Sequence, residues 1–283
     1  MRWKQSRRSS NIEDRRGTRM KKGLLSGGLG TIAFLLIAHF FGYGPAMLFK
    51  AGTSLLPARE VSSGPRPAAE NEQAEMVATV LADTEDVWTE QFRRMGLRYE
   101  QPTLVLFTGM TESACGLAQE AMGPFYCPGD RKVYVDLQFY DDMKRQFGAS
   151  GDFAQAYVVA HEVGHHVQTL LGISDQVEKL RRRAGKREGN RIQVRMELQA
   201  DCYAGVWANH TQHNRQFLEK GDIEEGLNAA AAIGDDRLQR QTQGRVVPDA
   251  FTHGTSEQRV KWFYIGMKSG DMNQCDTFST RDL

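Results

Sequence analysis

Two histidines and a glutamate form the pattern whose chemistry is clearest in this chain. His161, Glu162 and His165 read HExxH. On an α-helix, positions i and i+4 lie on one face, about one turn apart. Two imidazoles in that arrangement can share a tetrahedral Zn²⁺, and the glutamate can reach a water molecule beside the metal. The pattern therefore predicts metal-assisted hydrolysis, which is chemistry that can cleave an amide bond.

The residues around the motif have the pattern of an amphipathic helix from residue 152 to residue 171. Apolar positions recur at spacings of three and four: Val159, Val163, Val167 and Leu170. They lie roughly opposite the two histidines, so one face can be buried while the other faces a cleft. Asp152 is a suitable N-cap residue, and Gly172 is suited to end the helix. The alternative is a core helix with two satisfied histidines.

A catalytic zinc site usually has three protein ligands and one open position. The metzincin pattern would place Gly at 168 and His at 171, but these positions hold Gln168 and Leu171, which excludes that class. A better candidate for the third ligand lies downstream, at Glu197 and Asp201, which share one face of a helix predicted over residues 191–209. The first can bind the metal, and the second can accept a hydrogen bond from a ligand histidine. The alternative is a solvated helical face that carries two acids.

HExxH followed by Glu-x-x-x-Asp resembles the gluzincin metallopeptidases. The wider sequence resembles the bacterial putative neutral zinc metallopeptidase family, whose members are membrane-anchored and carry a basic N-terminus. The likeness covers nearly all of the chain after residue 71 and also its start. The matching segments are Met1–Trp3, Ser113–Gly116, Gly123–Pro128, Val133–Leu137, Gly234–Gln239 and His253–Arg259.

This resemblance implies one Zn²⁺ per chain, bound by His161, His165 and Glu197. It also implies that Glu162 is the general base and that Asp201 supports His161. We expect a water molecule activated by zinc to attack a peptide bond, with Glu162 taking its proton and passing it to the leaving amine. The expected partner is a peptide or protein substrate, whose identity the resemblance does not give.

The start of the chain predicts a membrane anchor. Residues 24–49 contain no Asp, Glu, Lys or Arg. This uncharged segment is long enough to cross a bilayer core of about 30 Å. The preceding basic residues place that end in the cytoplasm by the positive-inside rule, so the catalytic part lies outside the bacterial inner membrane, in the periplasm or beyond. They are Arg2, Lys4, Arg7, Arg8, Arg15, Arg16, Arg19, Lys21 and Lys22. A cleaved signal peptide and a buried core helix are the alternatives.

The charges divide at the same point. Nine basic against two acidic residues give residues 1–22 a net charge of +7, and since the whole chain is +1, the remainder carries −6. The first part suits anionic lipid headgroups, and the acidic remainder argues against nucleic-acid binding. We therefore expect a cytoplasmic tail (1–23), a single transmembrane segment (24–49), a linker rich in Pro, Gly and Ser (50–71) and a zinc peptidase domain (72–283).

Within that domain the patterns predict helices over residues 72–95 and 139–147 and strands over residues 103–108 and 132–137. The expected fold is therefore α+β, with a small antiparallel sheet, the HExxH helix and one preceding transmembrane helix. Gluzincins lay an extended substrate along a sheet edge. By that resemblance, the strand at 132–137 is either the edge that pairs with substrate or an ordinary core strand.

The four cysteines agree with an oxidising compartment. Cys115 and Cys127 flank a loop that contains Gly and Pro, and Cys202 and Cys275 remain as a second pair. Four cysteines allow three pairings, so the sequence alone leaves the connectivity open. A second zinc site is the rival interpretation, but the spacing between the first two is wrong for a zinc knuckle.

His253 lies just before a helix that a capping box of Thr255 and Gln258 would start. The ending with His253 and Arg259 resembles that of membrane-associated gluzincin peptidases, which implies that His253 donates a hydrogen bond to the oxyanion that develops during peptide cleavage. The alternative is a loop histidine that holds the turn. Arg259 follows one turn into that helix. Its expected partner is Asp201 or Asp235, or it is an ordinary surface arginine.

Two further functions stay open at this level. The domain can be a zinc-stabilised binding or scaffold module of the envelope that cleaves nothing efficiently, or a zinc amidase that acts on non-peptide amides. Glu162 favours an enzyme, because a purely structural zinc site needs no general base. A fourth protein ligand closing the metal site would favour the scaffold.

Overall fold

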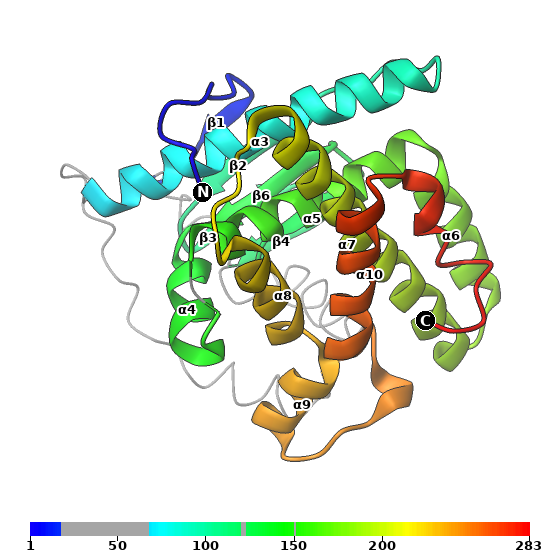
Figure 1. The fold of residues 1–283 in the computed structure, drawn as a ribbon. Helices are drawn as coiled ribbons and strands as arrows, with labels where there is room; N and C mark the ends of the chain where they lie inside the picture. The colour runs from blue at the N-terminus through cyan, green and yellow to red at the C-terminus, as the bar shows by residue number, and fades with distance from the viewer. Residues whose placement is uncertain (18–67, 120–122, 150) are drawn as a thin grey trace.

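The computed structural model describes residues 1–17, 68–119, 123–149 and 151–283 (Figure 1). Its helices are α3 (Ala68–Arg94), α4 (Gln138–Phe147), α5 (Asp152–Leu170), α6 (Ile173–Arg183), α7 (Lys186–Arg215), α8 (Asp222–Ala232), α9 (Asp235–Gln243) and α10 (Ser256–Ser269), with short 3-10 turns at Pro248–Ala250 and Met272–Cys275. Its strands are β1 (Ile12–Asp14), β2 (Thr103–Phe107), β3 (Met110–Ser113), β4 (Gly116–Gln119), β5 (Phe125–Cys127) and β6 (Lys132–Asp136). The predicted α+β class is confirmed, and helices predominate.

The main sheet is mixed, so the prediction of an antiparallel sheet is wrong. Its strand order is β1-β2-β6-β5, where β1, β2 and β6 run parallel and only β5 is antiparallel to its neighbour. A parallel pair needs a long connection, and residues 108–131 supply one between β2 and β6. That connection contains the separate β3–β4 hairpin.

Strand β6 lies inside the sheet, between β2 and β5. It therefore has no free edge along Lys132–Tyr134, where it pairs with both neighbours. Val133 to Asp136 are all buried, so both faces of the strand are covered rather than one. The prediction that this strand pairs with substrate is wrong, and the alternative of a core strand is correct.

Helix α5 runs through the centre of the helical layer and packs against α7 and α8 (Figure 1). Val159, Val163 and Val167 are fully buried, as the apolar stripe predicts. Small residues set the close contacts between helices. A Cβ atom on Gly164 would lie 3.0 Å from the carbonyl oxygen of Ala200, so α5 and α7 approach closely beside the HExxH motif. Gly172 has φ +74°, which suits its predicted role as the helix stop.

Residues 1–17 are part of this fold and do not form the separate tail that the sequence predicted. Strand β1 pairs with β2, and the side chains of Met1 and Trp3 are buried in the main core. The predicted transmembrane segment at 24–49 and most of the linker lie outside the described residues. Helix α3 begins at Ala68, before the predicted end of the linker. No helix in the described ranges is long and apolar enough to span a bilayer.

Candidate metal centre

Helices α5 and α7 bring the three predicted metal ligands together. The Nε2 atoms of His161 and His165 lie 3.2 Å and 3.4 Å from the same oxygen, Oε2 of Glu197. His161 and Glu197 are buried, at 5% and 6% exposure, and His165 is nearly so. Within the described residues, these three donors form a cluster in which all ligand atoms lie within 4.8 Å of one another, and it holds no fourth His, Cys, Asp or Glu.

The spacing of these donor atoms fits zinc. Bonds of about 2.0–2.1 Å to a tetrahedral Zn²⁺ place neighbouring donors about 3.4 Å apart. The observed separations of 3.2 Å and 3.4 Å match that edge. The donor set of two imidazoles and one carboxylate is also one that catalytic zinc sites use. The residues of this cluster can therefore hold Zn²⁺ and leave one position for water or substrate.

The outward-facing nitrogen of each histidine has its own acceptor. Nδ1 of His161 lies 2.8 Å from Oδ1 of Asp201, and Nδ1 of His165 lies 2.9 Å from Oε1 of Gln168. Each imidazole donates through Nδ1, so its Nε2 lone pair is directed toward the cluster. The sequence predicted the contact of Asp201. The contact of Gln168 was not predicted, because in the sequence this residue stands out only as a departure from the metzincin pattern.

Asp201 is a fully buried carboxylate with several partners. The Arg259 guanidinium donates to both of its oxygens, at 2.9 Å from Nε and 2.8 Å from Nη2, and the Tyr157 hydroxyl also donates to it. Burial alone would raise the pKa of Asp201, but Arg259 and His161 lower it, so the carboxylate stays charged. Of the partners expected for Arg259, the structure selects Asp201.

The same charges act on the ligands in the metal-free chain. Burial would lower the pKa of His161, but Asp201 and Glu197 raise it to about 9. Burial likewise opposes the effect of Glu197, which raises the pKa of His165. In return, the two histidines lower the pKa of Glu197 against burial. Because a metal ligand must be deprotonated, a metal that binds at this site would displace protons from the imidazoles.

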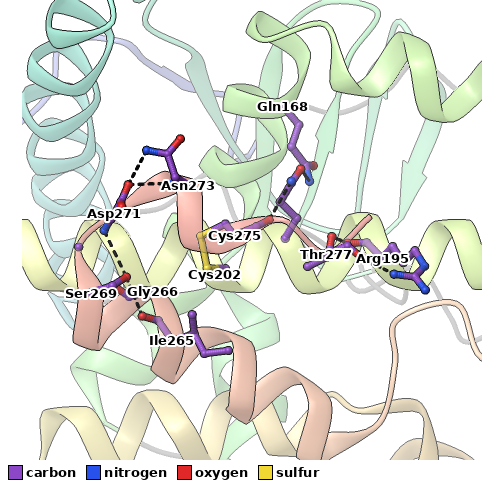
Figure 2. Close-up of a disulfide and its surroundings, with 12 residues drawn as sticks. Gln168, Arg195, Cys202, Ile265, Gly266, Ser269, Asp271, Asn273, Cys275 and Thr277 are labelled. Atoms are coloured by element: carbon purple, nitrogen blue, oxygen red, sulfur yellow. Dashed lines mark hydrogen bonds between the residues drawn. A yellow bond between two sulfur atoms is a disulfide. The ribbon is translucent and has the colours of Figure 1, made fainter. Parts of the chain in front are cut away.

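A chain of hydrogen bonds links His165 to the second disulfide. The amide of Gln168 donates to Oε1 of Gln199 at 3.0 Å, and the amide of Gln199 donates to the carbonyl oxygen of Cys275 at 3.0 Å. Figure 2 shows Gln168 directed toward Cys275 and the bond from Cys275 to Cys202, which follows Asp201 in α7. The disulfide therefore holds in place the carbonyl of Cys275. This carbonyl fixes Gln199, which in turn fixes Gln168, the hydrogen-bond acceptor of His165.

Both pairs of cysteines are disulfides. Cys115 is joined to Cys127, and Cys202 is joined to Cys275. The prediction of disulfides is confirmed, and the structure selects one of the three pairings. A second zinc site built from these cysteines is excluded, because all four are bonded.

Glu162 follows the first ligand and is also buried, at 8% exposure. Burial raises the pKa of its carboxyl, although the neighbouring His161 and His165 lower it. A more basic carboxylate suits the role of a general base. The hydroxyl of Tyr140 on α4 is buried without a hydrogen-bond partner in the described structure. Its burial, and to a smaller extent the charge of Glu162, raises the pKa of this hydroxyl. Tyr140 could not be identified from the sequence, because nothing in its local pattern links α4 to the HExxH helix.

His253 is placed at the rim of the site by the loop before α10. Its backbone nitrogen and its Nδ1 lie 2.6 Å and 3.2 Å from the two oxygens of Asp235, and its side chain is half-exposed. Burial would lower the pKa of His253, but Asp235 and the nearby charge of Glu197 raise it. The predicted capping box of Thr255 and Gln258 is present. The ring is therefore anchored to the loop and lies within electrostatic range of the metal ligands.

Tyr157 and Arg259 complete the site around Asp201. Tyr157 precedes His161 by one helical turn, so its position on the same face was a usable signal. The pairing of Arg259 depends on how α10 crosses α7. At that crossing, a Cβ atom on Gly266 would lie 1.9 Å from the carbonyl oxygen of Cys202. Such a contact between distant segments could not be assigned from spacing.

Several known proteins are similar to this chain in sequence. A family model described as "Putative neutral zinc metallopeptidase" matches residues 1–278. The chain is 52% identical over 289 residues to a protein of Escherichia coli K12 named "Uncharacterized protein YpfJ", covering 98% of this chain and 99% of that one. It is 48% identical over 195 residues to "Uncharacterized protein Mb2605" of Mycobacterium bovis, covering 65% of each chain. No solved structure matches. The chain therefore belongs to the putative neutral zinc metallopeptidase family.

Proposed function

We propose that this protein is a zinc-dependent metallopeptidase that hydrolyses peptide bonds, with a gluzincin-like site. The observation that carries the proposal is the cluster of His161, His165 and Glu197, whose donor atoms have the separations of a tetrahedral zinc site. A bound Zn²⁺ would supply a Lewis acid that polarises the scissile carbonyl and activates water. The family membership supports the same reaction class.

The roles of the surrounding residues follow from their contacts. Glu162 takes the proton of the attacking water on its carboxylate and delivers it to the leaving amine, and its buried position favours the protonated state that delivery requires. Asp201 and Gln168 fix the two imidazoles through Nδ1. His253, anchored by Asp235, donates a hydrogen bond to the developing oxyanion.

Two observations favour an enzyme over a zinc-stabilised scaffold. In the part of the chain that the structure describes, no fourth metal-binding side chain closes the cluster. Glu162 also occupies a buried position next to the ligands, where a structural site would not need a carboxylate. The same geometry suits a non-peptide amide equally well, so the amidase alternative differs only in substrate.

We also propose that the catalytic domain works in an oxidising compartment, outside the inner membrane. The two disulfides support this location, because cytosolic thiols are kept reduced. The apolar run at residues 24–49 supports association with the membrane.

Two measurements test the proposal. In the His161→Ala protein, elemental analysis is expected to find no bound zinc, and stoichiometric zinc would refute the ligand set. A comparison of labelled protein termini from cells that express wild type or Glu162→Gln is expected to reveal new termini in the wild type alone. The absence of such termini would refute the proposal of a peptidase and favour the amidase or the scaffold.

A further inference from the structure

The first sixteen residues are built into the catalytic domain, although the apolar run at 24–49 separates them from it in the sequence. Strand β1 pairs with β2 in register, with Ile12 opposite Leu104. Backbone hydrogen bonds extend the contact on both sides: the nitrogen of Ser9 donates to the carbonyl of Ala78, and the nitrogen of Arg15 donates to that of Leu106. The segment thus supplies one strand of the four-stranded sheet.

A buried carboxylate on α3 receives this segment. Glu85 is 1% exposed, and its hydrogen bonds come from Ser9 at 2.5 Å, Asn11 at 2.8 Å and Arg7 at 3.0 Å. Without the segment, this buried charge would lose those partners. A buried carboxylate needs such partners, so the surface of α3 is suited to the docked segment. The amino group of Met1 makes a similar contact, 2.9 Å from Asp152 at the start of the HExxH helix.

Several of the basic residues that predicted a cytoplasmic tail, all within residues 1–17, form ion pairs with the domain. Arg7 pairs with Asp86 at 2.8 Å, and Arg8 pairs with Glu75 at 3.0 Å. Arg16 is buried, and its guanidinium bonds to the carbonyl of Glu70 at the start of α3. The positive charge of the segment therefore has a structural use that is independent of the positive-inside rule, and it complements the acidic remainder of the chain.

Docking of the segment conflicts with a single membrane crossing. One crossing at residues 24–49 would place residues 1–17 and residues 68–283 on opposite sides of the membrane, where they cannot form one sheet. A helical crossing takes about 20 residues, so the 26 residues of the apolar run are too few for two crossings. We propose that the amino-terminal segment and the catalytic domain lie on the same side of the membrane.

Cysteine labelling in spheroplasts tests this topology. Arg8 and Glu75 are 40% and 60% exposed, so Arg8→Cys and Glu75→Cys each present a reactive thiol, while the four native cysteines are bonded and silent. If the domain lies outside the inner membrane, as proposed above, a membrane-impermeant maleimide is expected to label both full-length single variants. Labelling of neither above the level of the unsubstituted protein, with both above that level after permeabilisation, also supports a common side. Labelling of only one of the two before permeabilisation, with both reactive afterwards, would overturn the proposal.

A second measurement tests docking itself. In the double variant Arg8→Cys/Glu75→Cys, a short permeant bismaleimide is expected to join the two thiols in intact membranes. The matched control pairs Arg8→Cys with Glu178→Cys on α6, at the other end of the molecule from the N-terminus (Figure 1), and should stay unlinked. Absence of the link in membranes would overturn docking. Neither readout depends on zinc or on hydrolysis, so the peptidase proposal can fail independently.

Discussion

Replacing Asp201 with Asn removes a buried charge while keeping the shape of the side chain. Asp201 is fully buried and accepts from Nδ1 of His161 at 2.8 Å, so we expect a weaker acceptor to loosen the orientation of that imidazole. Partners of this kind typically contribute a factor of 10–100 in metal affinity. Because the Asn oxygen can still accept a hydrogen bond, we expect the zinc affinity to fall about tenfold, or about 1.4 kcal/mol.

The same substitution leaves Arg259 as a buried cation, 2% exposed, without its carboxylate. Breaking a buried ion pair from one side costs about 3–5 kcal/mol, and we expect the lower end because the Tyr157 hydroxyl remains 3.3 Å from the guanidinium. The free energy of unfolding of the metal-free Asp201→Asn protein should therefore fall by about 3 kcal/mol.

Two assays separate these effects. Competition with a calibrated chelator gives the zinc affinity, and urea unfolding in excess chelator gives the stability. The double variant Asp201→Asn/Arg259→Met removes both charges, so it should recover most of the lost stability and none of the zinc affinity. A zinc affinity within twofold of wild type in Asp201→Asn would refute the idea that this carboxylate holds His161.

Three further perturbations have expected outcomes. Replacing Cys202 and Cys275 with Ser opens a bridge that spans 73 residues, which should lower the free energy of unfolding by about 4 kcal/mol in the chain-entropy view, and an unchanged urea midpoint would contradict this. Burial lowers the pKa of His166 to about 4, so between pH 6.5 and 4 the unfolded chain binds the extra proton and the folded state loses stability as the pH falls. In the His166→Gln protein, the free energy of unfolding should fall by about 3 kcal/mol less between pH 7 and pH 4 than in the wild type, as measured from unfolding curves at both pH values. An equal fall in the two proteins would argue against this role of His166. Tyr140→Phe removes a buried hydroxyl that has no hydrogen-bond partner among the described residues, so it should raise the free energy of unfolding by about 1 kcal/mol. A loss of stability would show that the hydroxyl does have a partner.

The metal-binding residues could be identified from the sequence because their arrangement is local. His161 and His165 lie one turn apart on α5, and Glu197 and Asp201 lie one turn apart on α7, so helical periodicity alone places each pair on one face. Gln168 was missed for a different reason. Its contact with His165 is equally local, but a side-chain amide is not among the usual acceptors for a metal-binding histidine, which are carboxylates, backbone carbonyls and water.

The sheet could not be predicted in the same way. Its order depends on β1, a three-residue strand in a segment whose charges resemble those of a cytoplasmic tail. Pairing between Ile12 and Leu104 is a contact over more than ninety residues, and no local pattern encodes it. Strand β6 was judged from the alternation of its apolar side chains, but coverage of both faces and both edges is a property of the assembled sheet.

The central claim is that Glu162 transfers protons beside a zinc ion held by His161, His165 and Glu197. It is tested most directly by measuring zinc content and hydrolysis of fluorescein-labelled casein for purified wild-type protein and Glu162→Gln. We expect about one zinc per chain in both proteins, and turnover at least about 100-fold lower in the variant, as for loss of a general base. Full turnover by Glu162→Gln, with zinc bound, would contradict the account.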